Sequence, residues 1–501
     1  MINKKKLRSM ALLVSLIATA SFTSVSHASM MMKYGIETCQ ELQQIGQTLP
    51  ANAEYTLTKD IDCTATNPNN SNYDAATYPN NGFLPINNFT GTFDGQNHTI
   101  FGLYIHPVPL LSYTGLFGKL GNGAQISRVK LVDIDVEGPS WTGALVALNE
   151  HQTVVHDVYV SGIVTGYGST GGIIGSTKNT TAYNLEFEGT VKSGDQREVK
   201  STFGGIIGSG NKTSLYGGKF TGRVIVENSY NVGGAFGYLK EGTLSNIIVD
   251  ADIYAPSTNG VGGIVGTFET ESSVSNIVSM GHVRGKWTVG GFFGTAYIRE
   301  LSNSYSSANV VASGSHVGGL IGRGRAYVTN SYSSGLVKGL ENVGGLFGST
   351  YSAYSGDATI ENSLSYSPVV GTSNVGALVG FLENNSYKSL VNNYIQKESL
   401  VSRDGGITYS PSDLTLAVGN RSNITSGIAV VDSDRLKSRD FYSSTLHWSD
   451  EIYEYDNSSS GKRLYTPSRR QYVEYSLTQD AGNIEITYDH PEVVTSGVPI
   501  K

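Results

Sequence analysis

The sequence predicts an all-β protein: a parallel β-helix solenoid of about ten coils, preceded by a helix/strand cap. Three observations lead to this fold class. Glycine supplies 61 of 501 residues and charged residues only 15%, against usual shares of about 7% and about 25%. A glycine-rich phrase of six residues recurs along the chain. The stretches between its copies are short runs of Val, Ile, Leu, Tyr, Phe, Ser and Thr, which favour strands.

The recurring phrase is typified by V-G-G-L-I-G at residues 317–322. Ten copies, from Y-T-G-L-F-G at 113–118 to V-G-A-L-V-G at 375–380, follow one another at intervals of 26 to 33 residues. A unit of this size cannot bury its own interior, so successive units are expected to stack around one core. The anchors of the copies are Thr114, Gly143, Gly171, Gly204, Gly233, Gly262, Gly290, Gly318, Gly344 and Gly376.

The glycines of the phrase are expected to allow positive φ and close backbone approach where the coil turns. Between them lies an aliphatic pair, such as Leu320 and Ile321. Strand alternation predicts that one member of each pair points outward. The result would be an apolar stripe along the rod, suited to a partner or a covering segment. The alternative is that a bulge or corner turns both members inward.

A second motif follows each anchor by roughly 12 to 18 residues: a polar residue just before a short strand-forming run. Asn and Asp tolerate left-handed backbone, so this position predicts another corner. Asn side chains stacked at one corner can also bond to each other. The predicted Asn ladder consists of Asn246, Asn276, Asn303, Asn330 and Asn362. Arg128, Asp157, Asn184 and Asn392 hold equivalent places, and Gly217 departs from the pattern in the fourth copy.

The N-terminus has the features of a signal peptide. Lys4, Lys5, Lys6 and Arg8 precede an apolar run that is too short for a membrane span, and S-H-A ends at Ala28. The mature chain is therefore expected to begin near Ser29, with no membrane span. In an exported chain, Cys39 and Cys63 are expected to form a disulfide.

Five segments are expected along the chain. They are a signal peptide at 1–28, a cap and solenoid entry at 29–105, the β-helix at 106–400, a closing segment at 401–468 and a polar tail at 469–501. The cap is expected to contain an amphipathic helix over 36–49 followed by a strand.

The phrase V-G-G-L-x-G followed by N-S-Y-S-x-G-x-V-x-G resembles the GLUG repeat of bacterial surface proteins. That repeat also occurs in the non-catalytic part of immunoglobulin A-cleaving metallopeptidases. The resemblance covers about 113–395 and is clearest at 289–310, 317–339 and 343–371. It implies an exported, right-handed β-helix of the kind often found in adhesin-like proteins, and it implies no reaction. The zinc motif His-Glu-x-x-His of those peptidases is absent from this sequence.

Two groups of residues are candidates for chemistry. Asp133, Asp135 and Glu137 would share one strand face, where carboxylates can bind Ca²⁺ or assist proton abstraction; the alternative is a solvated acidic face. His151 and His156 lie five residues apart, so a strand would place them on opposite faces. No catalytic, cofactor-binding or metal residue is therefore assigned, and Ca²⁺ is the one cofactor considered.

Tyrosine is abundant, and Tyr, Ser and Asn together form good contact surfaces. Tyr305, Tyr332 and Tyr394 fall at equivalent places of three coils. Other coils hold Ile248, Val278 and Leu364 there. An inward, structural role is expected for this position.

The leading functional hypothesis is a non-enzymatic, secreted or surface-located protein with an adhesin-like role. Its partner would be a glycoconjugate or protein on a host or bacterial surface. A formal net charge of −7 without a basic stripe argues against nucleic acid. The alternatives are a polysaccharide lyase or hydrolase on the same fold, and a structural component of an extracellular matrix or appendage.

Overall fold

The computed structural model describes residues 32–79, 82–107, 111–194, 201–270, 272–351, 358–383, 390–403, 407–410, 414–438, 440–448, 475–480 and 483–488. The expected signal peptide lies outside the described residues. So does most of the expected tail, apart from an antiparallel hairpin formed by β43 (Tyr475–Asp480) and β44 (Asn483–Tyr488).

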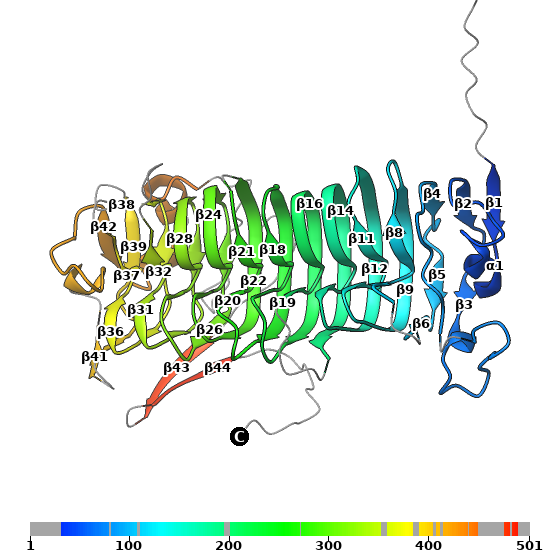
Figure 1. Ribbon diagram of the computed structural model, residues 1–501. Coiled ribbons are helices and arrows are strands. Elements are labelled where there is room, and N and C mark those ends of the chain that lie inside the picture. The colour runs from blue at the N-terminus through cyan, green and yellow to red at the C-terminus, as the bar shows by residue number, and fades with distance from the viewer. Residues whose placement is uncertain are drawn as a thin grey trace, which may run out of the picture.

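The predicted β-solenoid is confirmed. The chain winds into a rod whose coils lie side by side from β1 at one end to β42 at the other (Figure 1). Neighbouring coils pair through parallel strands along almost the whole rod. At a strand spacing of about 4.8 Å, ten coils give a rod of roughly 45–50 Å.

One flat side of the rod is a ten-stranded parallel sheet built from the first half of the glycine phrase. All nine predicted glycine anchors stand in register here, each the Cα partner of the next. Thr114 pairs with Thr142, so the first copy is anchored by Gly115, one residue later than expected. The strands are β7 (Tyr113–Thr114), β10 (Trp141–Gly143), β13 (Ser169–Gly171), β15 (Thr202–Gly204), β17 (Asn231–Gly233), β20 (Gly260–Gly262), β23 (Val289–Gly290), β27 (Val317–Gly318), β31 (Glu341–Gly344) and β36 (Ser373–Gly376).

The remaining sides of the coils belong to one large sheet that bends around the core. Strands that start the second side are β8 (Phe117–Leu120), β11 (Val146–Asn149), β18 (Phe236–Leu239), β21 (Val265–Phe268), β32 (Phe347–Thr350) and β37 (Val379–Phe381). Longer strands that turn a corner are β9 (Gln125–Gly138), β12 (Thr153–Gly166), β14 (Ile174–Ser193), β16 (Ile207–Ile225), β19 (Leu244–Tyr254), β22 (Ser273–Gly285), β24 (Phe293–Ser302) and β28 (Ile321–Thr329).

In the later coils the third side is divided into shorter strands. These are β25 (Tyr305–Ser306), β26 (Asn309–Ala312), β29 (Tyr332–Ser333), β30 (Val337–Lys338), β33 (Thr359–Glu361), β34 (Leu364–Ser365), β35 (Val369–Val370), β38 (Leu390–Val391), β39 (Asn393–Gln396) and β40 (Val401–Arg403). The interior between all sides is one continuous apolar core.

The coils at the N-terminal end are irregular versions of the later ones. β1 (Lys33–Ile36), β2 (Glu54–Leu57) and β4 (Thr92–Asp94) pair in parallel and therefore belong to three successive coils. The helix α1 (Cys39–Gln44) lies between β1 and β2 in the chain, and β3 (Ile61–Asp62) and the 3₁₀ turn Thr64–Thr66 follow β2. β5 (Thr99–Phe101) and β6 (Tyr104–Ile105) lead into the regular coils.

The helix α1 is shorter than the predicted helix over 36–49. Thr38 and Glu41 form a reciprocal capping box at its start. Ile45 is extended and Gly46 has φ +79°, so the helix ends after six residues. The expected disulfide is confirmed: Cys39 and Cys63 are bonded, joining α1 to the segment after β3.

The C-terminal end contains one more incomplete coil. Leu416–Gly419 stacks on the last full phrase, where Leu378 donates to the Ala417 carbonyl and Val418 bridges to Val379. L-A-V-G is thus a partial eleventh copy that sequence analysis missed, because it lacks the glycine pair. β42 (Ile428–Val431) adds the last parallel strand, and β41 (Ile407–Tyr409) pairs antiparallel to β40. The turn Leu414–Leu416 is a 3₁₀ helix.

Candidate binding face

The anchor glycines of the phrase are needed because other backbone atoms approach them closely, and not because they adopt positive φ. None of the nine has positive φ, so that part of the expectation is wrong. A Cβ on Gly290 would lie 2.0 Å from the Phe293 carbonyl oxygen, and one on the next glycine, Gly291, 2.2 Å from the Ser306 Oγ across the coil. The corner is so tight that side chains are excluded by the backbone itself.

The aliphatic pairs are buried on both members, each with at most 1% exposure. In the copy at 317–322, β27 ends at Gly318 and β28 begins at Ile321, so Gly319 and Leu320 form a corner between two strands. The strand alternation that would expose one residue of each pair is interrupted there. The predicted apolar stripe at this position is therefore wrong, and the alternative holds.

The five residues of the expected Asn ladder all have left-handed backbone, with φ between +47° and +57°. Asn276 Nδ2 donates to the side-chain Oδ1 of Asn246 at 3.3 Å, and Asn330 Nδ2 donates to Oδ1 of Asn303 at 3.2 Å. Asn392 donates to Asn362 at 2.7 Å. The equivalent Arg128, Asp157, Asn184 and Gly217 also have positive φ, so Gly217 keeps the conformation while lacking the side chain.

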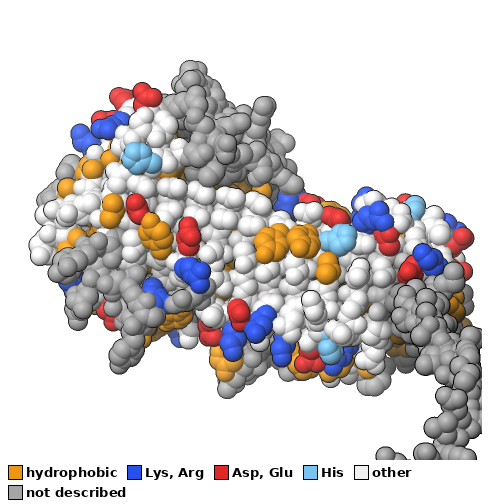
Figure 2. Space-filling view, turned by 90° about the horizontal axis from the view of Figure 1, so that it is seen from above, with side chains coloured by type: hydrophobic (Ala, Val, Ile, Leu, Met, Phe, Trp, Pro, Cys, Tyr) orange, Lys and Arg blue, Asp and Glu red, His pale blue; other side chains and the backbone are white. Residues whose placement is uncertain are grey.

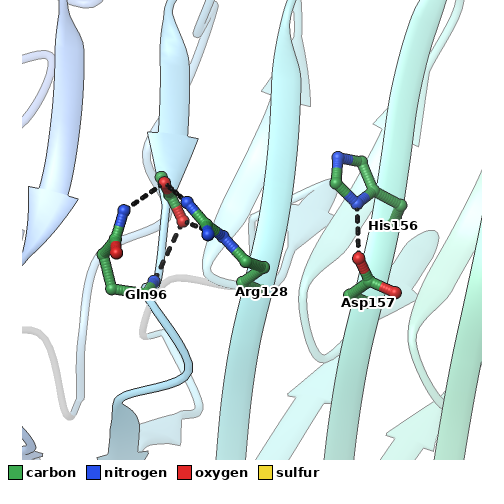
Figure 3. Close-up of polar contacts among 5 residues, drawn as sticks. Gln96, Arg128, His156 and Asp157 are labelled. Atoms are coloured by element: carbon green, nitrogen blue, oxygen red, sulfur yellow. Dashed lines mark hydrogen bonds and ion pairs between the residues drawn. The ribbon is translucent and has the colours of Figure 1, made fainter.

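At the N-terminal end the same corner carries charge (Figure 3). Arg128 Nε donates to the Asp94 carboxylate at 2.9 Å, and the Gln96 backbone amide donates to it at 3.0 Å. Asp157 accepts from Asn184 at 2.8 Å and lies 2.8 Å from His156 Nδ1. The Asn184 amide, followed by His156, lowers the pKa of Asp157.

A second polar column escaped sequence analysis. Thr288, His316, Asn342 and Asn374 directly precede the valine of four successive phrases, and all four have positive φ. Asn374 donates to Asn342 at 2.8 Å, and Asn342 Nδ2 lies 3.3 Å from His316 Nδ1. The signal in the sequence is the polar residue immediately before V-G-G. Burial, followed by the charge of Arg323, lowers the pKa of His316.

The position shared by Tyr305, Tyr332 and Tyr394 points outward, which corrects the inward role expected for it. These residues belong to a second apolar cluster, separate from the solenoid core. Tyr305 and Tyr332 stack with ring centroids 4.9 Å apart. Tyr305 and Tyr332 are buried and Tyr394 is partly buried, because the C-terminal segment covers this side of the rod.

We call that covering segment, residues 432–438 and 440–448, the strap. It contains the 3₁₀ turn Arg435–Lys437 and the π-helical turn Phe441–Thr445. Trp448 stacks over Tyr332 at 6.1 Å and donates from Nε1 to the Asn362 carbonyl at 2.8 Å. The Tyr366 and Tyr442 hydroxyls are bonded at 2.8 Å. The rod thus has an outward apolar stripe with a cover, at a different position from the predicted stripe.

Nearer the N-terminal end, none of the segments that the structure describes covers the outward columns of the same sheet in the way that the strap covers the later coils. Tyr183 and Tyr216 are partners on β14 and β16, with ring centroids 5.5 Å apart. Tyr183 is 42% exposed. His156 precedes Tyr183 in the column. Beyond the corner at Asp157, Asn184 and Gly217, Tyr159, Glu186 and Lys219 form the neighbouring outward column. Figure 2 shows hydrophobic side chains gathered beside a His, with acidic and basic side chains nearby on the same surface. We call Tyr159, Tyr183 and Tyr216 with their polar neighbours the tyrosine face.

The acidic run on β9 is divided by a left-handed residue. Asp133 has φ +55° and the register with β12 shifts there. Asp135 and Glu137 point outward to His106, whose Nε2 lies 2.9 Å from Asp135 and whose Nδ1 lies 3.6 Å from Glu137. Tyr167 donates to Glu137 at 3.0 Å. Across the described ranges, no group of three or more His, Cys, Asp or Glu side chains is arranged to hold a metal ion.

Two smaller observations concern chemistry. His151 is exposed in the turn before β12, apart from His156 on that strand. A shallow pocket is lined by residues 122–125 and 152–154, and none of these side chains titrates. In the part of the chain that the structure describes, no helix has the length and hydropathy needed to cross a membrane.

Fold and surface together define a repeat protein of the parallel β-solenoid class. No protein-family model matches the sequence. Halomucin of Haloquadratum walsbyi is 35% identical over 153 residues, which are 29% of this chain and 2% of halomucin. An immunoglobulin A1 protease of Streptococcus sanguinis is 25% identical over 264 residues, 49% of this chain and 12% of that protein. The chain therefore spans a small part of the curated relatives it matches.

Among solved structures, a candidate immunoglobulin A1 protease from Bacteroides ovatus aligns over 87% of this chain and 92% of that chain. The sequence identity is 17% and the TM-score is 0.26. The sequence similarity to the streptococcal protease agrees with the resemblance noted for the repeat.

Proposed function

We propose that this chain is an exported β-solenoid protein of the GLUG-repeat type with an adhesin-like role: it binds a surface component of a host, a matrix or another bacterium. The observation that carries the proposal is the tyrosine face. It presents one exposed tyrosine, Tyr183, and two half-buried ones, Tyr159 and Tyr216, on the outer surface of a rod whose interior is filled by core side chains. Rigid aromatic residues provide contact area at low entropic cost.

Export is supported by the disulfide between Cys39 and Cys63, because disulfides persist in oxidising compartments outside the cytoplasm. The N-terminal segment, with its basic start and apolar run, has the features of a signal peptide that directs such export. Secretion or attachment to the cell surface is the localisation we propose.

The lyase or hydrolase alternative requires a carboxylate cluster free to act on a substrate. Asp135 and Glu137 are the nearest match to this requirement, and both are engaged by His106. That engagement favours a structural role for the two carboxylates. The alternative of a matrix or appendage component needs no ligand at all.

A binding screen separates these functions. The chain from residue 29 to 501, purified with its disulfide intact, is applied to immobilised glycans, matrix proteins and intact host and bacterial cells. Saturable binding without turnover of the bound polymer is expected. Release of shortened or unsaturated sugar products would establish the enzyme, and absence of binding to every surface would overturn the adhesin-like role.

A further inference from the structure

We propose that the tyrosine face binds an uncharged, hydroxyl-rich ligand: a neutral glycan chain. This inference rests on the proposed binding function and names its substrate class. It is carried by the charges, hydrogen bonds and exposures of residues on β12, β14 and β16.

The charged groups of the tyrosine face are paired with one another. Lys219 is paired with Glu186 at 2.5 Å, and Glu188 accepts from the Tyr159 hydroxyl at 2.9 Å. Asp157 is bonded to His156 and Asn184. The charged groups of the face are therefore satisfied within the face. A polyanion would meet three carboxylates, and a polycation would have to displace Lys219. Among glycans, these carboxylates therefore favour a neutral chain over an anionic one.

The tyrosine face keeps hydrogen-bonding groups that a ligand can use. The Tyr183 and Tyr216 hydroxyls make no hydrogen bond within the described parts of the chain. Each can donate one hydrogen bond and accept others. The engaged carboxylates of Glu186 and Glu188 keep lone pairs that accept from ligand hydroxyls. Sugar hydroxyls both donate and accept, so they match this mixed set.

Two tyrosines of the face form a row along the rod. Tyr183 and Tyr216 occupy the same place on adjacent coils, so the contacts repeat at a strand spacing of about 4.8 Å. A ligand that repeats along one direction gains from such a row. A linear glycan lying along the rod axis meets one coil after another, and the rigid sheet holds each tyrosine without further ordering.

The experiment measures glycan binding by the full exported chain, residues 29–501. The probes are neutral oligosaccharides, uronate-containing oligosaccharides and sulfated oligosaccharides, immobilised in equal amounts. Neutral glycans are expected to bind, with little change in affinity when salt is raised. Preference for uronate or sulfated glycans, lost at high salt, would overturn the proposal.

Point variants place the site. Tyr183→Ala combined with Tyr216→Ala is expected to weaken glycan binding at least about tenfold, the effect of losing contact residues of a binding site. The matched control is Tyr254→Ala, because Tyr254 is also 42% exposed and lies on another outer column. It is expected to bind like the parent chain, and circular dichroism reports that each variant is folded.

The outcomes separate this inference from the function on which it rests. If the chain binds a protein or a cell and the double variant binds equally well, the glycan assignment fails while the adhesin-like role stands. If Tyr254→Ala weakens binding as much as the double variant, the ligand lies elsewhere on the rod. If no surface binds the parent chain, both fail.

Discussion

Glycine at the anchor of the phrase is required by distance. A Cβ at Gly290 would overlap backbone of its own coil and of the next, since it would lie 2.7 Å from the Gly322 nitrogen. Backbone cannot rotate away as a side chain can. A larger residue at this position therefore forces whole coils to shift.

We expect Gly290→Ala to lower the free energy of unfolding by about 3 kcal/mol or more, as overpacking of rigid surroundings does. The measurement is equilibrium unfolding in urea. Gly35→Ala is the control, because its Cβ would meet only the Thr58 methyl at 3.0 Å. Equal losses for the two variants would contradict the role of close backbone approach.

His316 gives the second corner column a dependence on pH. Its Nδ1 accepts from Asn342, which requires the neutral ring, and its folded-state pKa is lowered. The unfolded chain then binds the proton more readily than the folded chain does. The contribution of His316 to folding stability therefore falls as the pH drops below about 6.5.

We expect the stability difference between the parent chain and His316→Asn to shift in favour of the variant between about pH 7 and about pH 5. Asn at this position keeps the left-handed backbone that Asn342 shows. Thermal unfolding at both pH values measures the difference. A stability difference that stays constant with pH would show that the titration of His316 does not affect folding stability.

At the scale of elements, the strap explains why the outward column changes its chemistry along the rod. The column holds Glu186 and Lys219 in early coils and Val278, Tyr305, Tyr332 and Leu364 in later ones. The apolar part coincides with the cluster that the strap covers. The strap therefore clamps several coils together from outside.

Trp448→Ala is expected to destabilise the later coils by about 3–5 kcal/mol, the usual cost of removing a buried tryptophan. Hydrogen exchange of the amides in β29 and β34 should rise. Trp287→Ala serves as the control, because Trp287 is 47% exposed and should cost less than about 0.5 kcal/mol. Unchanged protection in β29 and β34 would show that the strap does not clamp the rod.

At the scale of the whole molecule, each coil contacts mainly its neighbours, so local stabilisation spreads only through shared interfaces. The disulfide acts at one end. It closes 24 residues between Cys39 and Cys63.

Replacing both cysteines by serine is expected to cost about 2–5 kcal/mol in the first coil. Loss of hydrogen-exchange protection should concentrate in β1, α1 and β2 and fade along the rod. Uniform loss from end to end would indicate one cooperative unit instead of a stack of coupled coils. Reductant added to the serine variant should have no further effect.

The sequence by itself determined the period, the register of the nine glycine anchors and the corner that holds the Asn ladder, whereas the second corner column was found only in the structure. These features are local. A coil closes only where small residues or residues with left-handed backbone recur, so every copy of the repeat carries such residues at the same positions. Gly217 shows this, because it keeps positive φ where Asn is missing.

Only the tertiary structure decided which surfaces face solvent. Leu320 and Ile321 both point inward because a corner interrupts the alternation. Tyr305 points outward and is nevertheless buried, because a segment more than a hundred residues later covers it. Neither fact follows from spacing along the chain. The burial of an outward side chain depends on which segment packs over it. That segment is distant in the sequence and is not part of the repeat, so the repeat pattern does not predict the contact.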